Sequence, residues 1–207
     1  MISEIIDHYA DVVRNVLDDD ICWTVVRPRS GRLEIDELVN RMALPAHELR
    51  SMYAFDEHAS APESPTEAGR QFLYFDQWDN SVSILQFTGF FTVLPEVAES
   101  LSGDAHAWIV NWNVNQDLEM FYWEDGSCTG VWDPYEPREE WATRLGSMSR
   151  YADILHEYCI EDDGINPDYR PELRKAAPLA VVELASGVRL DMEWRTREHP
   201  TLGIPWP

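Results

Sequence analysis

Basic residues are scarce in this sequence. Among 207 residues there are 16 Lys and Arg, of which only Lys175 is a lysine, against 38 Asp and Glu, so the formal net charge is −22. A chain of this charge repels the phosphate backbone of nucleic acid, which excludes direct nucleic-acid binding without a metal. Cysteine is also scarce. Cys22, Cys128 and Cys159 are odd in number and widely spaced, so we expect unpaired thiols rather than a disulfide framework.

Long apolar runs are absent as well. No apolar stretch approaches the roughly 18 residues needed to span a bilayer, and Met1–Asp7 contains no base. We therefore expect a cytoplasmic protein outside the membrane. The chain nevertheless has 44% hydrophobic residues and nine Trp, which is enough for a sizeable core. We expect a single α+β domain over residues 1–207.

The short signatures of common catalytic and metal sites are missing too. The sequence contains no GxSxG, GxxxxGK, GxGxxG, CxxC, HxxxH or HExxH pattern. Acyl-transfer and nucleotide chemistry therefore lack their usual parts, and we expect no catalytic residues, no cofactor and no metal ligands. A non-enzymatic protein is favoured over an enzyme.

One acidic segment keeps a metal-dependent alternative open. Glu161–Asp168 alternates carboxylates with an amide and Gly164, but it does not have the spacing of a calcium loop. His156 and Cys159 are three residues apart, so on a helix they would share a face. A solvated loop is the simpler interpretation, and a metal-dependent hydrolase using this acidic loop is the alternative.

Periodicity predicts an antiparallel sheet, a meander with hairpins, flanked by amphipathic helices. The clearest signal is the alternation of Trp108, Val110 and Trp112, followed by a second alternating strand and the turn Asp125-Gly126. We expect the helices to pack on one side of the sheet. The predicted helices are 3–18, 33–44, a short one near Pro95, 141–159, and 178–185 with Pro178 in its first turn; the predicted strands are 21–26, 71–77, 81–87, 106–113, 118–123 and 127–132; and 56–69 is an internal loop.

The distribution of charge is more informative than its sum. Residues 71–135 contain 10 acids and no base. A folded monomer of this size has roughly 9,900 Å² of surface, or about one uncompensated charge per 450 Å², whereas duplex DNA carries about one per 107 Å². The average is too dilute to imitate DNA. The base-free segment is instead where a basic partner is expected, although solubility alone also accounts for an acidic surface.

Aromatic residues are concentrated in the same segment and supply the second half of the hypothesis. Aromatic side chains are common both in sheets and in the energetic centres of interfaces. If both faces of the aromatic strands are apolar, the sheet is either covered twice or open to a partner. The candidate partner-binding residues are Asp76, Asp79, Asp104, Asp117, Glu119, Glu124, Asp125, Trp112 and Trp123.

Several segments, in order along the chain, resemble a family of actinobacterial domains of unknown function. They are Cys22–Arg27, the acidic stretch Glu34–Leu44, Phe87–Phe90, Leu101-Ser102, Trp112–Asn115, Phe121–Gly126, Gly187–Leu190 and Gly203–Pro205. The sequence departs from that pattern at Asp56–Gly69 and Glu161–Pro171. The resemblance implies a small intracellular α+β protein of an accessory or toxin-neutralising kind. It supplies no active-site residues.

The leading hypothesis is an acidic protein that binds, and inhibits, a basic protein partner. The partner would be a toxin or a nucleic-acid-handling protein in an immunity or phage-conflict setting. Charge would steer the encounter and aromatic residues would supply the contact energy. The third alternative is a homo-oligomeric scaffold subunit joined through the aromatic face of the sheet.

Overall fold

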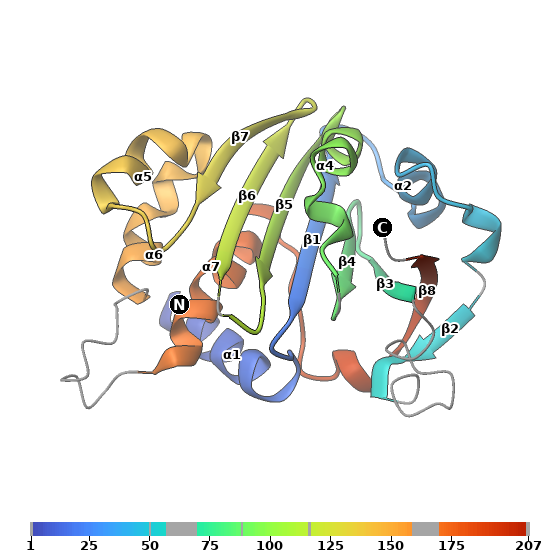
Figure 1. Cartoon of the computed structure of the whole chain (residues 1–207), viewed down its shortest axis with the longest axis horizontal. Helices are drawn as coiled ribbons and strands as arrows, with labels where there is room; N and C mark the ends of the chain where they lie inside the picture. Colours follow the sequence, from blue (N-terminus) through green and yellow to red (C-terminus); the bar gives the residue numbers. More distant parts are fainter. Residues whose placement is uncertain are drawn as a thin grey trace.

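An eight-stranded antiparallel sheet forms the centre of the computed structural model (Figure 1), which describes residues 2–49, 51–56, 70–87, 89–115, 117–158 and 170–205. The strand order is β2-β8-β3-β4-β1-β5-β6-β7. The strands are β1 (Ile21–Pro28), β2 (Ser51–Ala54), β3 (Arg70–Gln77), β4 (Val82–Gln86), β5 (Ala105–Trp112), β6 (Leu118–Glu124), β7 (Ser127–Trp132) and β8 (Glu198–Pro205). With the helices around it, the sheet confirms the predicted α+β class.

The helices are short, apart from the first and the last along the chain, which have 14 and 16 residues. They are α1 (Ile2–Asn15), α2 (Ile35–Arg41), α4 (Pro95–Ser102), α5 (Arg138–Arg144), α6 (Ala152–Tyr158) and α7 (Pro171–Ser186), with 3₁₀ turns η1 (Ala46–Glu48), η2 (Phe91–Val93), η3 (Gly146–Tyr151) and η4 (Trp194–Thr196). None of the helices in these described ranges is long and apolar enough to cross a membrane.

Helices cover both faces of the sheet, so the expectation that they pack on one side was wrong. Along β5, Trp108 and Trp112 belong to the core under α1 and α7, whereas Ala107 belongs to the core under α2 and α4. In Figure 1, α4 crosses in front of the sheet and α7 lies behind it. The physical reason is that β1 and β5 are apolar on both faces, and such strands require a cover on each side.

The β5–β6–β7 meander was predicted correctly from the alternation of its residues. β5 pairs with β6 from His106 opposite Glu124 to Trp112 opposite Leu118. The turn between β6 and β7 has positive φ at both Asp125 (51°) and Gly126 (70°), as a two-residue hairpin requires. The predicted β3–β4 hairpin is also present, with pairing from Tyr74 opposite Leu85 to Gln77 opposite Val82.

The helix predicted over 141–159 is broken in the structure. Its apolar seam is real, because Trp141, Leu145, Met148 and Leu155 are all buried. The chain nevertheless turns at Gly146, which has φ +53°, so the described part of the seam is divided into α5, η3 and α6. A Cβ at Gly146 would collide with the carbonyl oxygen of Thr129 in β7. Glycine is therefore required where this segment approaches the edge strand.

The last helix begins earlier than predicted. It starts at Pro171 and contains Pro178 in its interior, where the expected position was the first turn. An internal proline removes one backbone hydrogen bond. Burial of the surrounding Ala176–Val182 against the core offsets that loss. The predicted stop is correct, since Gly187 caps the helix with φ +78°.

Two strands at one side of the sheet were not predicted. β8 pairs with β2 and with β3, so it lies inside the sheet. It contains Pro200, Gly203 and Pro205, which are residues that argue against a strand, and β2 has only four residues. Of the predicted loop 56–69, residues 57–69 lie outside the described residues, and Asp56 is helical.

Candidate functional site

Five carboxylates gather where β1 and β6 begin and β5 and β7 end, and we call this set the acidic end. Its members are Asp19, Asp20, Asp117, Glu119 and Asp133. The backbone N–H of Val114, in the β5–β6 turn, donates to Asp20 Oδ1 at 2.8 Å and ties that turn to the segment before β1. The amide of Asn113 donates to Asp117 Oδ2 at 2.9 Å. The antiparallel pairing of β1 with β5 thus brings together acids that are far apart in the sequence.

The charges of the acidic end are not neutralised within the described chain. No Lys, Arg or His of the described residues lies within ion-pair distance of any of its five carboxylates. Burial raises the pKa of Glu119, and the like charges of Asp133 and Asp117 raise it further, whereas Arg144 acts in the opposite direction. Burial and the charges of Asp133 and Asp117 therefore favour the protonated form of Glu119.

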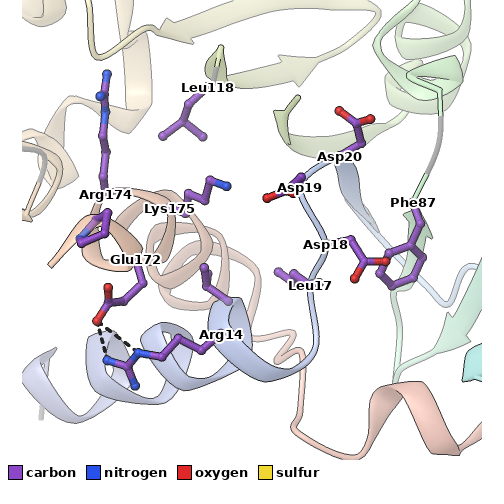
Figure 2. Close-up of a pocket in the computed structure, with 12 residues that line it drawn as sticks. Arg14, Leu17, Asp18, Asp19, Asp20, Phe87, Leu118, Glu172, Arg174 and Lys175 are labelled. Atoms are coloured by element: carbon purple, nitrogen blue, oxygen red, sulfur yellow. Dashed lines mark hydrogen bonds and ion pairs between the residues drawn. The ribbon is translucent and has the colours of Figure 1, made fainter. Parts of the chain in front are cut away.

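A cavity of about 680 Å³ opens beside the acidic end, between α1, the segment before β1 and the start of α7 (Figure 2). Asp19 and Asp20 line it together with the apolar Leu118 and Phe87. On its floor the guanidinium of Arg14 forms an ion pair with Glu172, drawn as dashed lines in Figure 2. That pairing cancels the charge of Arg14, so the unpaired charges of the cavity wall include those of Asp19 and Asp20.

Lys175, the only lysine of the chain, also lines this cavity. Its ammonium lies 5.0 Å above the ring of Trp112, at cation–π distance. Burial lowers the pKa of Lys175, while the charges of Asp19 and Asp20 act to raise it. No carboxylate among the described residues lies within ion-pair distance of Lys175. The two aspartates thus influence the lysine through space and remain open to another cation.

Four of the nine candidate residues are held by partners inside the protein. Asp104 forms an ion pair with Arg41 at 2.5 Å. Glu124 and Asp125 share Arg29 at 2.9 Å and 2.6 Å. Asp76 accepts hydrogen bonds from three residues of the C-terminal segment, Trp194, Arg197 and His199. These carboxylates stabilise the fold. Because they are already paired within the protein, they would attract a cationic partner less strongly.

The remaining candidates divide between the surface and the core. Asp79 is exposed in the β3–β4 turn and has no ion pair among the described residues. Trp112 is fully buried, and its indole N–H donates to the carbonyl oxygen of Asp18 at 3.0 Å, so it cannot contact a partner. Trp123 is half-buried and packs on the α4 side of the sheet. Only Asp117 and Glu119 belong to the acidic end.

Asp19, Asp20 and Asp133 were not predicted as site residues. In the sequence, Asp19 and Asp20 have the pattern of a helix end, and Asp133 follows a strand. The available signal was a run of three aspartates directly before a buried strand. Placing that run beside the β5–β6 turn requires the strand order, which the sequence does not specify.

Metal chemistry finds no support in the described residues. They contain no group of three or more His, Cys, Asp or Glu side chains that could hold a metal ion. The acidic loop Glu161–Asp168, and Cys159 of the His156–Cys159 pair, lie outside the described residues. The metal-dependent hydrolase therefore stays an untested alternative.

The aromatic face proposed for a scaffold is covered by this chain itself. Trp108, Trp112 and Tyr122 are buried in the core that includes α1 and α7. A subunit interface on that face would need the helices to leave it. The other face of the sheet holds Phe121 and Trp123, which are only half-buried, so the scaffold alternative stays a prediction.

No family model, no curated protein and no solved structure matches the chain. The resemblance to actinobacterial domains of unknown function therefore stays a prediction. The fold and the site define an α+β protein with a strongly acidic end beside a cavity.

Proposed function

We propose that this protein is a non-enzymatic binding protein whose acidic end binds a basic protein partner. The observation that supports the proposal is the contrast between the acids of the chain. Asp104, Glu124 and Asp125 each have an arginine partner within the protein. Asp117 and Glu119 have none among the described residues, and burial and like charges raise the pKa of Glu119. A cationic side chain from a partner would relieve that repulsion.

The cavity gives the proposed contact a shape as well as a charge. Asp19 and Asp20 stand at its wall, and Leu118 and Phe87 supply apolar surface elsewhere in the same cavity. Arginine and lysine side chains combine an apolar stem with a charged head. A partner residue of this type fits a cavity that offers both kinds of surface. Long-range attraction by the acidic end would accelerate the encounter.

We propose a neutralising role for this contact. Toxins and enzymes that act on nucleic acid present basic surfaces to their substrate, and an acidic protein that covers such a surface blocks it. This is the role of an immunity protein in toxin or phage conflict.

We place the protein in the cytoplasm. Cys22 and Cys128 are free thiols, as expected in a reducing compartment. Burial raises the pKa of Cys22 to about 11, which suits a structural and unreactive thiol.

Two triple variants of equal charge test the proposed surface. The first, D117N/E119Q/D133N, neutralises the acidic end with side chains of the same shape, which retain an oxygen acceptor. The matched control, D36N/E96Q/E99Q, removes three exposed acids of α2 and α4 that have no ion pair among the described residues. Binding of octa-arginine peptide and of a panel of basic ribonucleases is measured by calorimetry at rising salt.

The first variant should bind about tenfold more weakly than wild type, since each ion pair lost with the partner contributes roughly 0.5 kcal/mol. The control should bind almost as well as wild type, and rising salt should weaken every complex. Equal losses in both variants would mean that net charge, and not this surface, determines binding. Affinity that does not respond to salt would contradict a charge-led contact.

A further inference from the structure

A second cavity, of about 330 Å³, lies at the opposite end of the strands from the acidic end. Arg27 is near the end of β1 and pairs with His106 near the start of β5, six strand positions from Ile21. At about 3.3 Å per residue the two ends are roughly 20 Å apart. Its lining includes Arg27, Arg29, Ser30, Gly31, Asn80 and Arg150, and we call it the arginine pocket.

Two of its three arginines lack an acidic partner. No carboxylate of the described residues lies within ion-pair distance of Arg27 or Arg150, and Arg27 donates instead to the carbonyl oxygen of Ser186 at 3.3 Å. Arg150 lies 4.8 Å from the ring of Tyr151. This is unusual in a chain with 38 acids and 16 bases, where a surplus of carboxylates is available to each arginine. Both arginines line the same cavity.

The third arginine is fixed in place by its surroundings. Arg29 forms ion pairs with Glu124 at 2.9 Å and with Asp125 at 2.6 Å. Beside it, His106 Nδ1 lies 2.7 Å from the hydroxyl of Tyr122 and 3.4 Å from Glu124 Oε1. Both carboxylates are thus paired with Arg29. Arg27 and Arg150 have no carboxylate partner among the described residues, so their positive charges are available to bind a ligand.

We propose that the arginine pocket binds the phosphate group of a small molecule, with Arg27 and Arg150 as the main ligands. The guanidinium group presents its N–H donors in a planar fork that matches phosphate oxygens two at a time. Ser30 and the amide of Asn80 supply neutral donors at the rim. This binding site is independent of the proposed function, because it uses other residues at the other end of the sheet.

The size and charge of the molecule favour a small anion over a polyanion. A volume of about 330 Å³ is at the lower end of the range for small-molecule sites, roughly 300–1,000 Å³. The net charge of −22 repels an extended polyanion that runs along the surface. A small anion inside the pocket is screened from the acidic end, since the separation exceeds two Debye lengths of about 8 Å at physiological salt.

Binding of inorganic phosphate to the full chain tests the proposal. The variant R27Q/R150Q removes the two free charges, and the control R32Q/R70Q removes two exposed arginines outside the pocket. Calorimetry and ¹⁵N–¹H spectra are recorded at constant ionic strength, with sodium chloride replacing phosphate in the reference. A second titration uses adenosine monophosphate, which separates free phosphate from a phosphate ester as the preferred source.

We expect phosphate to shift the amide signals of Ser30 and Gly31, and R27Q/R150Q to bind at least tenfold more weakly than wild type and the control. The tighter of the two titrants identifies the source of the phosphate group. If the double variant does not fold, R150Q alone gives the same comparison, because Arg150 is exposed and makes no hydrogen bond within the described chain. Absence of binding by both titrants, or equal binding by variant and control, would overturn the proposal.

Discussion

The imidazole Nδ1 of His199 lies 2.9 Å from the Asp76 carboxylate, and this contact links β8 to β3. The same carboxylate accepts a hydrogen bond from the indole N–H of Trp194 at 2.9 Å and one from Arg197 at 3.3 Å. The rings of His199 and Trp194 are stacked, with centroids 4.1 Å apart. Asp76 therefore organises the C-terminal segment against the sheet.

Replacing Asp76 with alanine should lower the free energy of unfolding by roughly 3 kcal/mol, about 1 kcal/mol for each hydrogen bond lost. Asp79→Ala is the matched control, because Asp79 is an exposed acid three residues away with no ion pair among the described residues. Its effect should stay within about 0.5 kcal/mol. Urea unfolding of both variants gives the comparison, and similar losses would contradict the structural role of Asp76.

Gly146 explains why one long helix becomes three short segments. Its φ is +53°, and a Cβ would collide with the Thr129 carbonyl oxygen. Gly146→Ala should cost roughly 3 kcal/mol, about 1 for the left-handed backbone and about 2 for the collision. Gly187→Ala isolates the backbone part, because Gly187 has φ +78° and nothing within 4 Å of an added Cβ. Equal costs in thermal or urea unfolding would show that η3 does not approach β7 this closely.

The sequence predicted the elements whose pattern is local. Trp108, Val110 and Trp112 alternate, and their strand was found; Trp141, Leu145 and Met148 recur at helical spacing, and all three are buried. The sequence could not reveal β8, because Pro200 and Pro205 argue against a strand that only long-range pairing stabilises. Propensity was overridden by tertiary contacts.

The candidate site was predicted in part for the same reason. Asp117 and Glu119 were found because they lie in the base-free segment. Asp104 and Glu124 lie there too, yet arginines from outside the segment, Arg41 and Arg29, neutralise them in the fold. Which acids stay unpaired depends on the strand order. The positions of residues along the sequence do not reveal that order.

The raised pKa of Glu119 makes the stability of the protein depend on pH. Burial, Asp133 and Asp117 all favour the protonated acid, so the folded chain binds this proton more tightly than the unfolded chain. Stability from this group is present below the ordinary carboxyl pKa and is lost as pH rises through the raised value. Glu119→Gln should therefore raise Tm at neutral pH and leave it unchanged in acid. Glu99→Gln, which changes an exposed acid of α4, should leave Tm unchanged at both neutral and acid pH. If Glu119→Gln also left Tm unchanged at neutral pH, the repulsion within the acidic end would be contradicted.

Lys175 reports on the cavity because no other lysine contributes to its signal. Reductive methylation with ¹³C-formaldehyde gives one side-chain resonance whose pH titration yields the pKa. We expect a value below the ordinary one for lysine, since burial disfavours the charged form. D19N/D20N should lower the pKa further, because the two carboxylates favour the ammonium ion. D36N is the control. If the pKa of Lys175 were the same in D19N/D20N as in wild type, Asp19 and Asp20 would not lie close enough to influence the lysine.

The most direct test of the central claim, that the acidic end binds a basic partner, is the pKa of Glu119 with and without a cationic ligand. Carboxyl ¹³C NMR follows the titration of Glu119 in the free protein and with saturating octa-arginine, with octa-glycine as the neutral reference. Positive charge at the acidic end should favour the carboxylate, so octa-arginine should lower the pKa of Glu119 and octa-glycine should not. A pKa of Glu119 that stays the same while octa-arginine is bound would show that the peptide binds elsewhere, and the account would be wrong.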